Sequence, residues 1–291
     1  MMTKNLLRLK DLSVDEIQDI LTHAQNIKNG KKIDHQGKIV ANLFFEPSTR
    51  THYSFVTAEY KLGCKIIDFS PAASSLTKGE TFYDTVKTFS MFGIDAIVIR
   101  SVQNEWYKEL KNIKTPLINA GDGTLDHPTQ TLLDLLTIQQ EFKKFKGLTA
   151  LIVGDILHSR VAHSNIDMMR RLGMHILVSA PKEFRDSQYE YIDFEDGLKR
   201  ADVVNMLRIQ NERLTDKMSM NIAEYNKLFG LNGARVKMMK PKAIIIHPAP
   251  VNRNVEINDD VMECSKSRIF KQIENGVFIR MAVIDRALRT K

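Results

Sequence analysis

Short apolar runs of strand length alternate along this chain with longer stretches in which apolar residues recur at helical spacing. The runs are rich in Val, Ile, Leu and Phe, as is typical of strands buried on both faces. They fall at residues 38–45, 65–70, 96–100, 115–119, 148–156, 175–180, 203–207 and 243–246. Strands that alternate with helices predict an α/β fold with two doubly wound domains, each a mainly parallel sheet flanked by helices.

The predicted helices carry local start and stop signals. Ser13 and Glu16 form a capping box ahead of apolar residues at helical spacing, and Gly30 is suited to close that helix. Pro128 suits the first turn of another helix. The remaining helices are expected at residues 51–62, 81–92 and 104–111, after Arg160, and at 276–289. Residues 71–80 are small, polar and aperiodic, which predicts a mobile loop.

The chain has 291 residues, which is long for one compact core, so two domains are expected. We place the boundary in or after the helix that begins at Pro128. The predicted parts are residues 1–135, residues 136–275 and a C-terminal helix, residues 276–291, that packs back on the first domain. Ligands of parallel sheets bind beyond the carboxyl ends of strands. The segments that follow predicted strands are therefore the places where a site is expected.

Composition narrows the possible functions. A net charge of +7 and a pI near 9.2 fit either nucleic-acid binding or an active site for anionic substrates. Basic residues are spread along the chain without a nucleic-acid-binding motif, so no nucleic-acid partner is expected. No segment approaches the roughly 18–20 apolar residues of a membrane helix, and the N-terminus lacks signal-peptide features. We expect a cytoplasmic protein with no membrane partner.

The two cysteines also limit the chemistry. Cys64 and Cys264 lie far apart in the sequence, and neither belongs to a Cys-x-x-Cys or Cys/His pair. They predict two inert buried thiols rather than a disulfide framework or a structural zinc site.

The most informative segment is FFEPSTRTHYSF, residues 44–55, where a predicted strand passes into a predicted helix. Its centre combines hydroxyls, a guanidinium and the unpaired amides of a helix start, which together suit a phosphate. A simple helix cap would need only the hydroxyls, so Arg50 favours an anion site. The chain has neither the P-loop of nucleotide hydrolases nor a dinucleotide-binding glycine motif.

Six segments occur in the order found in the transcarbamylases: FFEPSTRTHYSF, SSLTKGET, HPTQTLLDLLTI, GDILHSR, LRIQNER and HPAPVNR. They extend from Phe44 to Arg253, and the chain most resembles the catalytic chains of aspartate carbamoyltransferases. The resemblance implies a first domain that binds carbamoyl phosphate and a second that binds aspartate. The implied reaction is attack of the aspartate α-amine on the carbonyl carbon of carbamoyl phosphate, an early step of pyrimidine biosynthesis. We expect no cofactor. His158 and His163 flank Arg160 at a spacing that metal ligands can have, but they lack a carboxylate pattern, so no metal is expected.

Ornithine carbamoyltransferase is the main alternative within this superfamily, because it shares S-T-R-T and H-P-x-Q. It typically carries H-C-L-P late in the chain and lacks the lysine of SSLTKGE, whereas this chain has His247-Pro-Ala-Pro and Lys78. Arg208 suits a second carboxylate, while ornithine would need an acidic receptor for its ammonium group. An inactive regulatory relative is another alternative; it would be expected to have lost a charged site residue, and every one is present.

The resemblance also implies roles in the first domain. Four residues would hold the phosphate, the last of them also reaching the carbonyl oxygen: Ser48, Thr49, Arg50 and Thr51. Arg100 would bridge the phosphate and the carbonyl oxygen, and His127 would hydrogen-bond that oxygen in the manner of an oxyanion hole. Gln130 would take the carbamoyl NH₂ group. The less specific interpretations are a surface ion pair for Arg100 and a helix cap for His127.

In the second domain, Arg160 would bind the α-carboxylate of aspartate. Arg208 and Gln210, two residues apart, would bind its side-chain carboxylate. Pro248 and Ala249 would offer backbone carbonyls to the amino groups of the substrates, although the same segment also suits a simple turn. The sequence leaves open whether Arg253 contacts substrate.

The loop at residues 71–80 would serve a neighbouring subunit. Lys78, together with Ser74 or Ser75, would reach into that subunit's active site, where Lys78 would contact both substrates. The resemblance therefore implies a homotrimer with shared active sites. Whether regulatory chains bind, or larger assemblies form, is not decided by the sequence.

Overall fold

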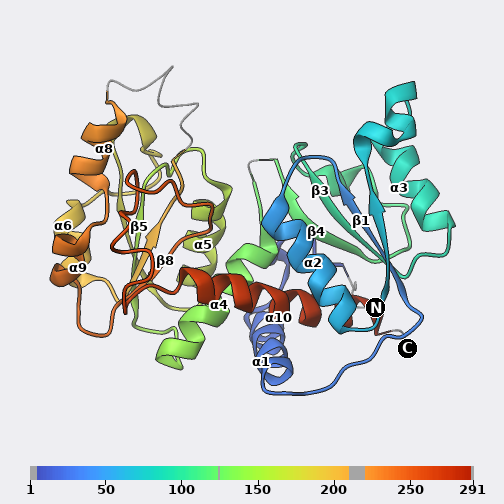
Figure 1. Ribbon diagram of the computed structural model, residues 1–291, viewed down its shortest axis with the longest axis horizontal. Coiled ribbons are helices and arrows are strands. Elements are labelled where there is room, and N and C mark those ends of the chain that lie inside the picture. Colours follow the sequence, from blue (N-terminus) through green and yellow to red (C-terminus); the bar gives the residue numbers. More distant parts are fainter. Residues whose placement is uncertain (1–4, 124, 210–219, 290–291) are drawn as a thin grey trace. The chain divides into compact units, whose positions relative to one another are not determined.

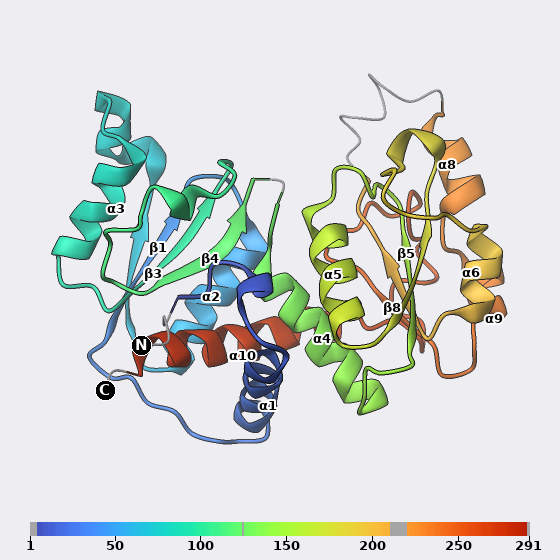
Figure 2. The same ribbon diagram turned by 180° about the vertical axis from the view of Figure 1, so that it is seen from behind.

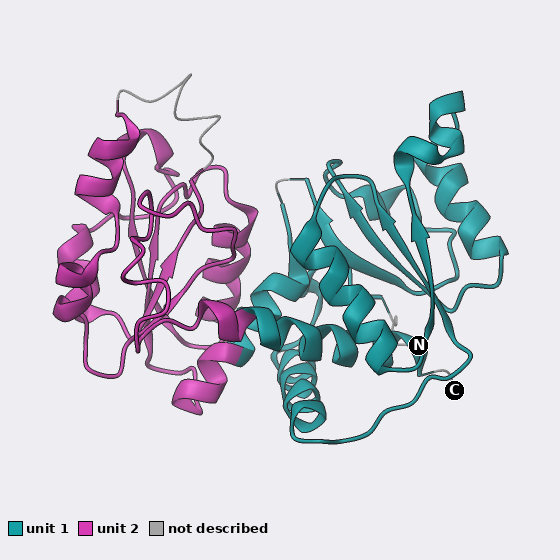
Figure 3. Ribbon diagram, in the orientation of Figure 1, with its two compact units in different colours: residues 1–136, 273–291 teal, residues 137–272 magenta. Residues whose placement is uncertain are grey.

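The computed structural model describes residues 5–123, 125–209 and 220–289. The chain divides into two compact units, shown in different colours in Figure 3. Unit 1 comprises Met1–Leu136 and Ile273–Lys291, and unit 2 comprises Thr137–Gln272. Both are four-stranded, all-parallel sheets flanked by helices, which confirms the predicted fold class (Figure 1). No helix among the described residues is long and apolar enough to cross a membrane.

Unit 1 contains a sheet with the strand order β2-β1-β3-β4. Its strands are β1 (Ile39–Phe44), β2 (Lys65–Phe69), β3 (Ala96–Ser101) and β4 (Leu117–Asp122). Its helices are α1 (Val14–Lys28), α2 (Thr49–Lys61), α3 (Phe82–Met91), the first part of α4 (Pro128–Phe142) and most of α10 (Ile269–Leu288). The predicted capping box of α1 is confirmed: the Ser13 hydroxyl accepts from the Glu16 amide, and the Glu16 carboxylate accepts from the Ser13 amide.

The helix predicted at residues 104–111 is wrong. Only a short 3₁₀ turn, η4 (Trp106–Lys108), forms there, after a left-handed backbone at Glu105 with φ of 51°. Trp106 and Tyr107 are buried in the unit 1 core, and Trp106 packs edge-on against Phe82. Burial of these large side chains, rather than helical periodicity, decides the backbone here.

The segment predicted as a loop at residues 71–80 contains local order. Two short 3₁₀ helices occupy it, η2 (Pro71–Ala73) and η3 (Ser75–Lys78). Gly79 closes the second with φ of 92°, a left-handed conformation that glycine adopts without steric cost. Most of the segment is exposed to solvent.

Unit 2 contains a sheet with the order β6-β5-β7-β8, visible from behind in Figure 2. Its strands are β5 (Thr149–Val153), β6 (His175–Ser179), β7 (Val203–Met206) and β8 (Ile244–Ile246). Its own helices are α5 (Arg160–Arg171), α6 (Phe194–Arg200), α8 (Ile222–Phe229) and α9 (Gly233–Met238). Leu151 and Val153 join one apolar cluster, while Ile152 between them joins another. Both faces of this sheet are therefore buried, as its continuous apolar strands predict.

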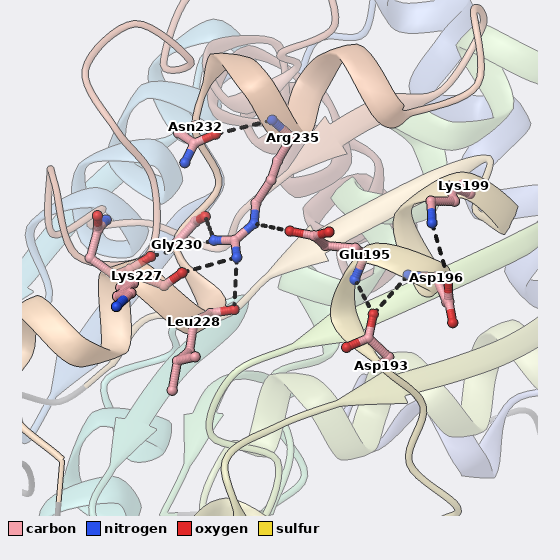
Figure 4. A network of polar contacts seen from close by, with 10 residues as sticks. Asp193, Glu195, Asp196, Lys199, Lys227, Leu228, Gly230, Asn232 and Arg235 are labelled. Atoms are coloured by element: carbon pink, nitrogen blue, oxygen red, sulfur yellow. Dashed lines mark hydrogen bonds and ion pairs between the residues drawn. The ribbon is translucent and has the colours of Figure 1, made fainter.

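An arginine-centred network fastens the helices of unit 2 (Figure 4). The Arg235 guanidinium donates to the carbonyl oxygens of Gly230, at 2.7 Å, and Lys227, at 3.0 Å, and so satisfies the C-terminal end of α8. It also pairs with Glu195 at 3.4 Å and lies over the Phe194 ring. All three nitrogens of this guanidinium are thus engaged by groups of unit 2.

The division between the units falls inside α4 and inside α10 (Ile269–Leu288). The C-terminal helix thus begins earlier than the residue 276 predicted from periodicity. In unit 1, the buried carboxylate of Asp285 on α10 faces His35, at 2.8 Å, and His23 of α1. Cys64 is buried as predicted, whereas Cys264 is only partly buried, so the expectation of two buried thiols is wrong for the second.

Both sheets have their topological switch point at the same place in the strand order. In unit 1, β1 pairs with β2 on one side and β3 on the other; in unit 2, β5 pairs with β6 and β7 in the same way. The crevice beyond the carboxyl ends of the two strands at such a point is where ligands bind. The segments singled out from the sequence follow β1, β4, β5, β7 and β8.

Candidate active site

The first part of the candidate site is the N-terminus of α2, directly after β1. Ser48 is the N-cap residue, yet its side chain makes no capping hydrogen bond, and the first turn contains no acidic residue. Ser48 therefore does not act as a simple helix cap. Arg50 is exposed and Thr51 is buried, with 7% of its surface accessible. A helix N-terminus of this kind attracts anions through its amides and its dipole.

Arg100 brings the ends of β1 and β3 together. Its strand position is paired with Phe44, two residues before Glu46, and its Nε donates to the Glu46 carboxylate at 2.6 Å. Its Nη1 donates to the carbonyl oxygen of Ala120 on β4, at 3.3 Å. Only 9% of Arg100 is accessible, so the less specific interpretation, a surface ion pair, does not describe it.

His127 is the point on which the side chains of this half-site converge. Its Nε2 lies 3.4 Å from Thr51 Oγ1 and 3.4 Å from Arg100 Nη1, and the residue is 6% accessible. A guanidinium can only donate, so Nε2 is the acceptor and the ring proton of the neutral imidazole is on Nδ1. Three residues from separate segments thus place two donors and an imidazole at one point beside the start of α2.

Gln130 is buried in the first turn of α4, three residues after His127. Its amide nitrogen donates to the Asp134 carboxylate at 2.9 Å, which orients the side chain. The Gln130 carbonyl oxygen is the acceptor that remains for an NH₂ group.

Sequence reasoning missed Glu46. The residue lies inside the motif FFEPSTRT, but its role depends on Arg100, 54 residues further along the chain. Nothing in the local pattern indicates that this carboxylate pairs with the arginine at the end of β3.

The two serines of the loop at residues 71–80 differ in their hydrogen bonds. The Ser74 hydroxyl donates to the Pro71 carbonyl oxygen at 2.7 Å and accepts from the Leu76 amide at 3.3 Å. Ser75 is exposed, and its hydroxyl makes no hydrogen bond with any described residue. Lys78 is exposed at the end of η3.

The second part of the candidate site lies in unit 2, after β5. Gly154 has φ of 123°, and a Cβ there would lie 3.1 Å from the Leu207 Cβ, so the turn requires glycine. The Asp155 carboxylate accepts from the His158 backbone amide, at 3.0 Å, and faces its Nδ1. Ser159 then caps α5, and Arg160 is the first residue of that helix, partly exposed.

Arg208 follows β7, the strand beside β5. The register pairs Val153 with Met206, so Arg208 and Asp155 each lie two residues beyond the paired positions. The Arg208 Nε is buried and has no hydrogen-bond partner within residues 5–123, 125–209 and 220–289. Gln210, predicted to act with it, lies outside the described residues.

The HPAP segment after β8 is held by buried polar groups. His247 Nδ1 accepts from the Ala249 amide at 2.8 Å, and its Nε2 faces the buried Glu256 at 3.3 Å. Ala249 has φ of 53° and precedes Pro250 through a cis peptide bond. Arg253 forms an exposed ion pair with Asp259 at 2.8 Å, which gives it a structural partner away from the turn.

The histidines do not form a metal centre in the part of the chain that the structure describes. No cluster of three or more His, Cys, Asp or Glu residues suited to a metal ion is found there. His158 is paired with Asp155, and His163 lies 3.4 Å from Asp186. The two histidines that flank Arg160 thus have separate acidic partners.

Comparisons with known proteins agree over the length of the chain. The family model "Aspartate/ornithine carbamoyltransferase, carbamoyl-P binding domain" matches residues 4–140, and the corresponding "Asp/Orn binding domain" matches residues 146–286. The aspartate carbamoyltransferase catalytic subunit of Staphylococcus saprophyticus is 50% identical over 99% of this chain and 98% of its own length. That of Staphylococcus epidermidis is 47% identical over 98% of this chain and its full length.

Solved structures show the same similarity. The aspartate transcarbamoylase of Trypanosoma cruzi in complex with carbamoyl phosphate has a TM-score of 0.88 at 28% identity, covering 96% of this chain and 94% of that chain. The catalytic subunit of the M. jannaschii enzyme has a TM-score of 0.86 at 33% identity, covering 98% of each chain.

Proposed function

This chain belongs to the aspartate/ornithine carbamoyltransferase family, and from that premise we propose how its residues act. It transfers the carbamoyl group of carbamoyl phosphate to the α-amine of L-aspartate, which gives N-carbamoyl-L-aspartate and phosphate, an early step of pyrimidine biosynthesis. The observation that carries the mechanism is the convergence of Thr51 and Arg100 on His127 beside the N-terminus of α2.

The electrostatic problem of the reaction is that both substrates are anions. Two like charges about 4 Å apart repel by roughly 4 kcal/mol at an effective dielectric of 20. Four residues at the start of α2 offset this repulsion by binding the phosphate group: Ser48, Thr49, Arg50 and Thr51. Their amides, hydroxyls and guanidinium bind phosphate oxygens, and the phosphate is a ready acceptor for the proton that the attacking amine loses.

The carbonyl group of carbamoyl phosphate is the second target of unit 1. Arg100 and His127 lie 3.4 Å apart, and Thr51 lies at the same distance from the imidazole. These groups stabilise the negative charge that develops on the carbonyl oxygen of the tetrahedral intermediate. Because His127 Nε2 accepts from Arg100, the ring must turn or exchange its tautomer to donate to that oxygen. The Gln130 carbonyl orients the carbamoyl NH₂ group.

Unit 2 provides the aspartate half-site. Arg160 binds the α-carboxylate, and Arg208, with Gln210, binds the side-chain carboxylate. The uncommitted, buried Nε of Arg208 supports this, because a carboxylate satisfies such a donor bidentately. The backbone carbonyls of Pro248 and Ala249 accept from the amino groups of the substrates.

The active site is completed by a neighbouring subunit in a homotrimer. Lys78 at the end of η3 supplies a cation that contacts both substrates there. Of the two adjacent serines, Ser75 is the better donor, because the Ser74 hydroxyl is engaged within its own loop. Unit 1 also exposes individual large apolar side chains, Tyr60 at 71%, Met91 at 70% and Phe92 at 66%, which contacts with another subunit would cover. The proposed location is the cytoplasm.

The substrate assignment is tested by transfer assays with aspartate and ornithine side by side. We expect carbamoylation of aspartate and little or none of ornithine, since Arg208 matches a carboxylate and repels an ammonium. Phosphate release and the carbamoylated product are both measured, so that simple hydrolysis of carbamoyl phosphate is recognised. Faster transfer to ornithine would overturn the assignment.

The shared site is tested by mixing two inactive variants, Arg50→Ala and Lys78→Ala, under conditions of subunit exchange. A mixed trimer contains a site with both native residues only if they come from different chains. We therefore expect activity to return in the mixture and to remain absent when either variant is carried through the same exchange alone. No return of activity, despite exchange shown by differently tagged chains, would contradict the contribution of Lys78 across the interface.

A further inference from the structure

An arginine outside every motif lies against the phosphate half-site. Arg280 belongs to α10 and is 3% accessible. Its Nη1 donates to Ser54 Oγ of α2 at 2.9 Å, and its Nη2 donates to Thr129 Oγ1 of α4 at 3.4 Å. The guanidinium also lies 5.1 Å from the centroid of the Phe55 ring. One planar group thus joins α2 and α4.

The two hydroxyls that it contacts adjoin the proposed phosphate-binding residues. Ser54 is three residues after Thr51, one helical turn along α2. Thr129 stands between His127 and Gln130 in the sequence. The guanidinium therefore links the second turn of α2 to the first turn of α4.

The fold makes room for this guanidinium. A Cβ at Gly276, four residues earlier on α10, would lie 2.5 Å from Arg280 Nη1 and 3.3 Å from Leu133 Cδ2. An alanine at this position would favour the helix intrinsically, yet it would collide with the bound guanidinium. The glycine inside the helix is explained by the space that the arginine needs.

The charge of Arg280 has no acidic partner among the residues that the structure describes. Its bonds there go to neutral hydroxyls, and its Nε is buried without a partner. Burial, with a contribution from the nearby Arg100, lowers the pKa of Arg280 to about 9. A buried cation beside another cation is unfavourable unless an anion compensates it. A phosphate held at the start of α2 provides that anion.

We propose that Arg280 is a positioning residue of the phosphate half-site, which clamps the second turn of α2 to the first turn of α4 and adds positive charge behind the bound phosphate. This inference rests on the proposed function, since phosphate binding gives the clamp its purpose. It assigns a part of the substrate site to the C-terminal helix, far in sequence from the S-T-R-T and H-P-T-Q motifs.

The same helix offers a matched control. Arg286 also binds elements of unit 1, through the Asn5 carbonyl oxygen at 3.0 Å and Glu16 at 3.3 Å. It contributes to packing against the N-terminal segment and has no link to α2 or α4 in its hydrogen bonds among the described residues. A purely structural role for Arg280 would give the variants of both arginines the same phenotype.

The experiment measures the affinity of the full-length protein for inorganic phosphate by titration calorimetry, together with KM for each substrate and the melting temperature. Four variants are compared with the wild type: Arg280→Met, Arg280→Lys, Gly276→Ala and Arg286→Met. We expect Arg280→Met to weaken phosphate binding roughly tenfold or more and to raise KM for carbamoyl phosphate more than KM for aspartate.

The other variants separate charge from geometry. Arg280→Lys keeps the charge but cannot bridge both hydroxyls, so an intermediate loss is expected. Gly276→Ala keeps the arginine and displaces its guanidinium, so phosphate binding is expected to weaken although the charge is retained. Arg286→Met lowers the melting temperature and leaves phosphate affinity within twofold of wild type.

Two results overturn the inference while leaving the proposed function intact. The first is a wild-type phosphate affinity in Arg280→Met or, if that variant does not fold, in both Arg280→Lys and Gly276→Ala. The second is an equal loss of phosphate affinity in Arg286→Met. A wild-type protein that neither binds phosphate nor transfers the carbamoyl group overturns the inference and the proposed function together.

Discussion

The two halves of the proposed site occupy equivalent places in two similar sheets, yet they differ in burial. In unit 1 the polar groups of Arg100, His127 and Gln130 are at most 9% accessible and already hydrogen-bonded. In unit 2, Arg160 and Arg208 are partly exposed, and part of the segment that follows Arg208 lies outside the described residues. The switch point of a parallel sheet determines where a ligand binds, but packing around it determines how far the site is assembled beforehand.

The physical reason lies in what surrounds each switch point. In unit 1 the start of α4 follows β4, and α10 lies against α2 and α4 through Arg280, so the polar groups are enclosed. Enclosure strengthens each electrostatic interaction because fewer water dipoles screen it. We infer that the residues proposed to bind the carbonyl group are prearranged in unit 1, whereas the arginines proposed to bind aspartate in unit 2 are less enclosed.

The largest effect is expected from Arg100→Met. It removes a buried guanidinium that we propose acts on both the phosphate and the developing oxyanion, so kcat/KM for carbamoyl phosphate should fall about 10³-fold. Steady-state kinetics with each substrate varied in turn measures the change. Because the variant leaves Glu46 without its arginine, the double variant Glu46→Gln/Arg100→Met is the control for an unpaired carboxylate. A loss of less than tenfold in both would contradict the role of Arg100.

A smaller and more selective effect is expected from Arg208→Met. Loss of the proposed bidentate contact with the aspartate carboxylate should raise KM for aspartate about 10²-fold, while phosphate affinity stays within twofold of wild type. Arg253→Met is the matched control, since that arginine pairs with Asp259 on the surface. An equal rise of KM for aspartate in the two variants, or a weaker phosphate affinity in Arg208→Met, would contradict the functional distinction between the two half-sites.

The smallest effect concerns stability and the buried acids of the two units. Glu59 on α2 is fully buried, and burial raises its pKa to about 8, because only the Asn42 amide donates to it among its described contacts. Glu256 in unit 2 is equally buried but faces His247 at 3.3 Å. The folded state of unit 1 therefore holds a proton on Glu59 that the unfolded chain releases near pH 4.3.

This raised pKa makes the folded state less stable as the pH rises. The contribution of protonated Glu59 to the free energy of unfolding is complete below about pH 4 and is lost as the pH rises toward 8. Between pH 5 and pH 6.5 the loss amounts to about 2 kcal/mol, at about 1.4 kcal/mol per pH unit. Denaturant unfolding of wild type and Glu59→Gln across this window measures it, and the variant should lose less stability. Parallel pH curves for the two proteins would show that Glu59 is ionised in the folded state.

Much of the fold was predictable from local pattern. The apolar runs correspond to strands, and all but the edge strands β2 and β6 are buried along nearly their whole length. The capping box at Ser13 begins α1 as expected. Local signals failed where distant packing decides the backbone. Trp106 and Tyr107 lie in a core formed with strands elsewhere in the chain, and the helix expected around them did not form.

The sequence by itself determined which segments follow strands, that one of them begins a helix with groups suited to a phosphate, and which family the chain resembles. These features depend on short stretches whose spacing is set by backbone geometry. Only the tertiary structure showed that Arg100 is buried between Glu46 and His127, and that Arg280 reaches Ser54 from 226 residues away. Such contacts cannot be read from local pattern, because a side chain's charge environment is determined by the elements packed around it.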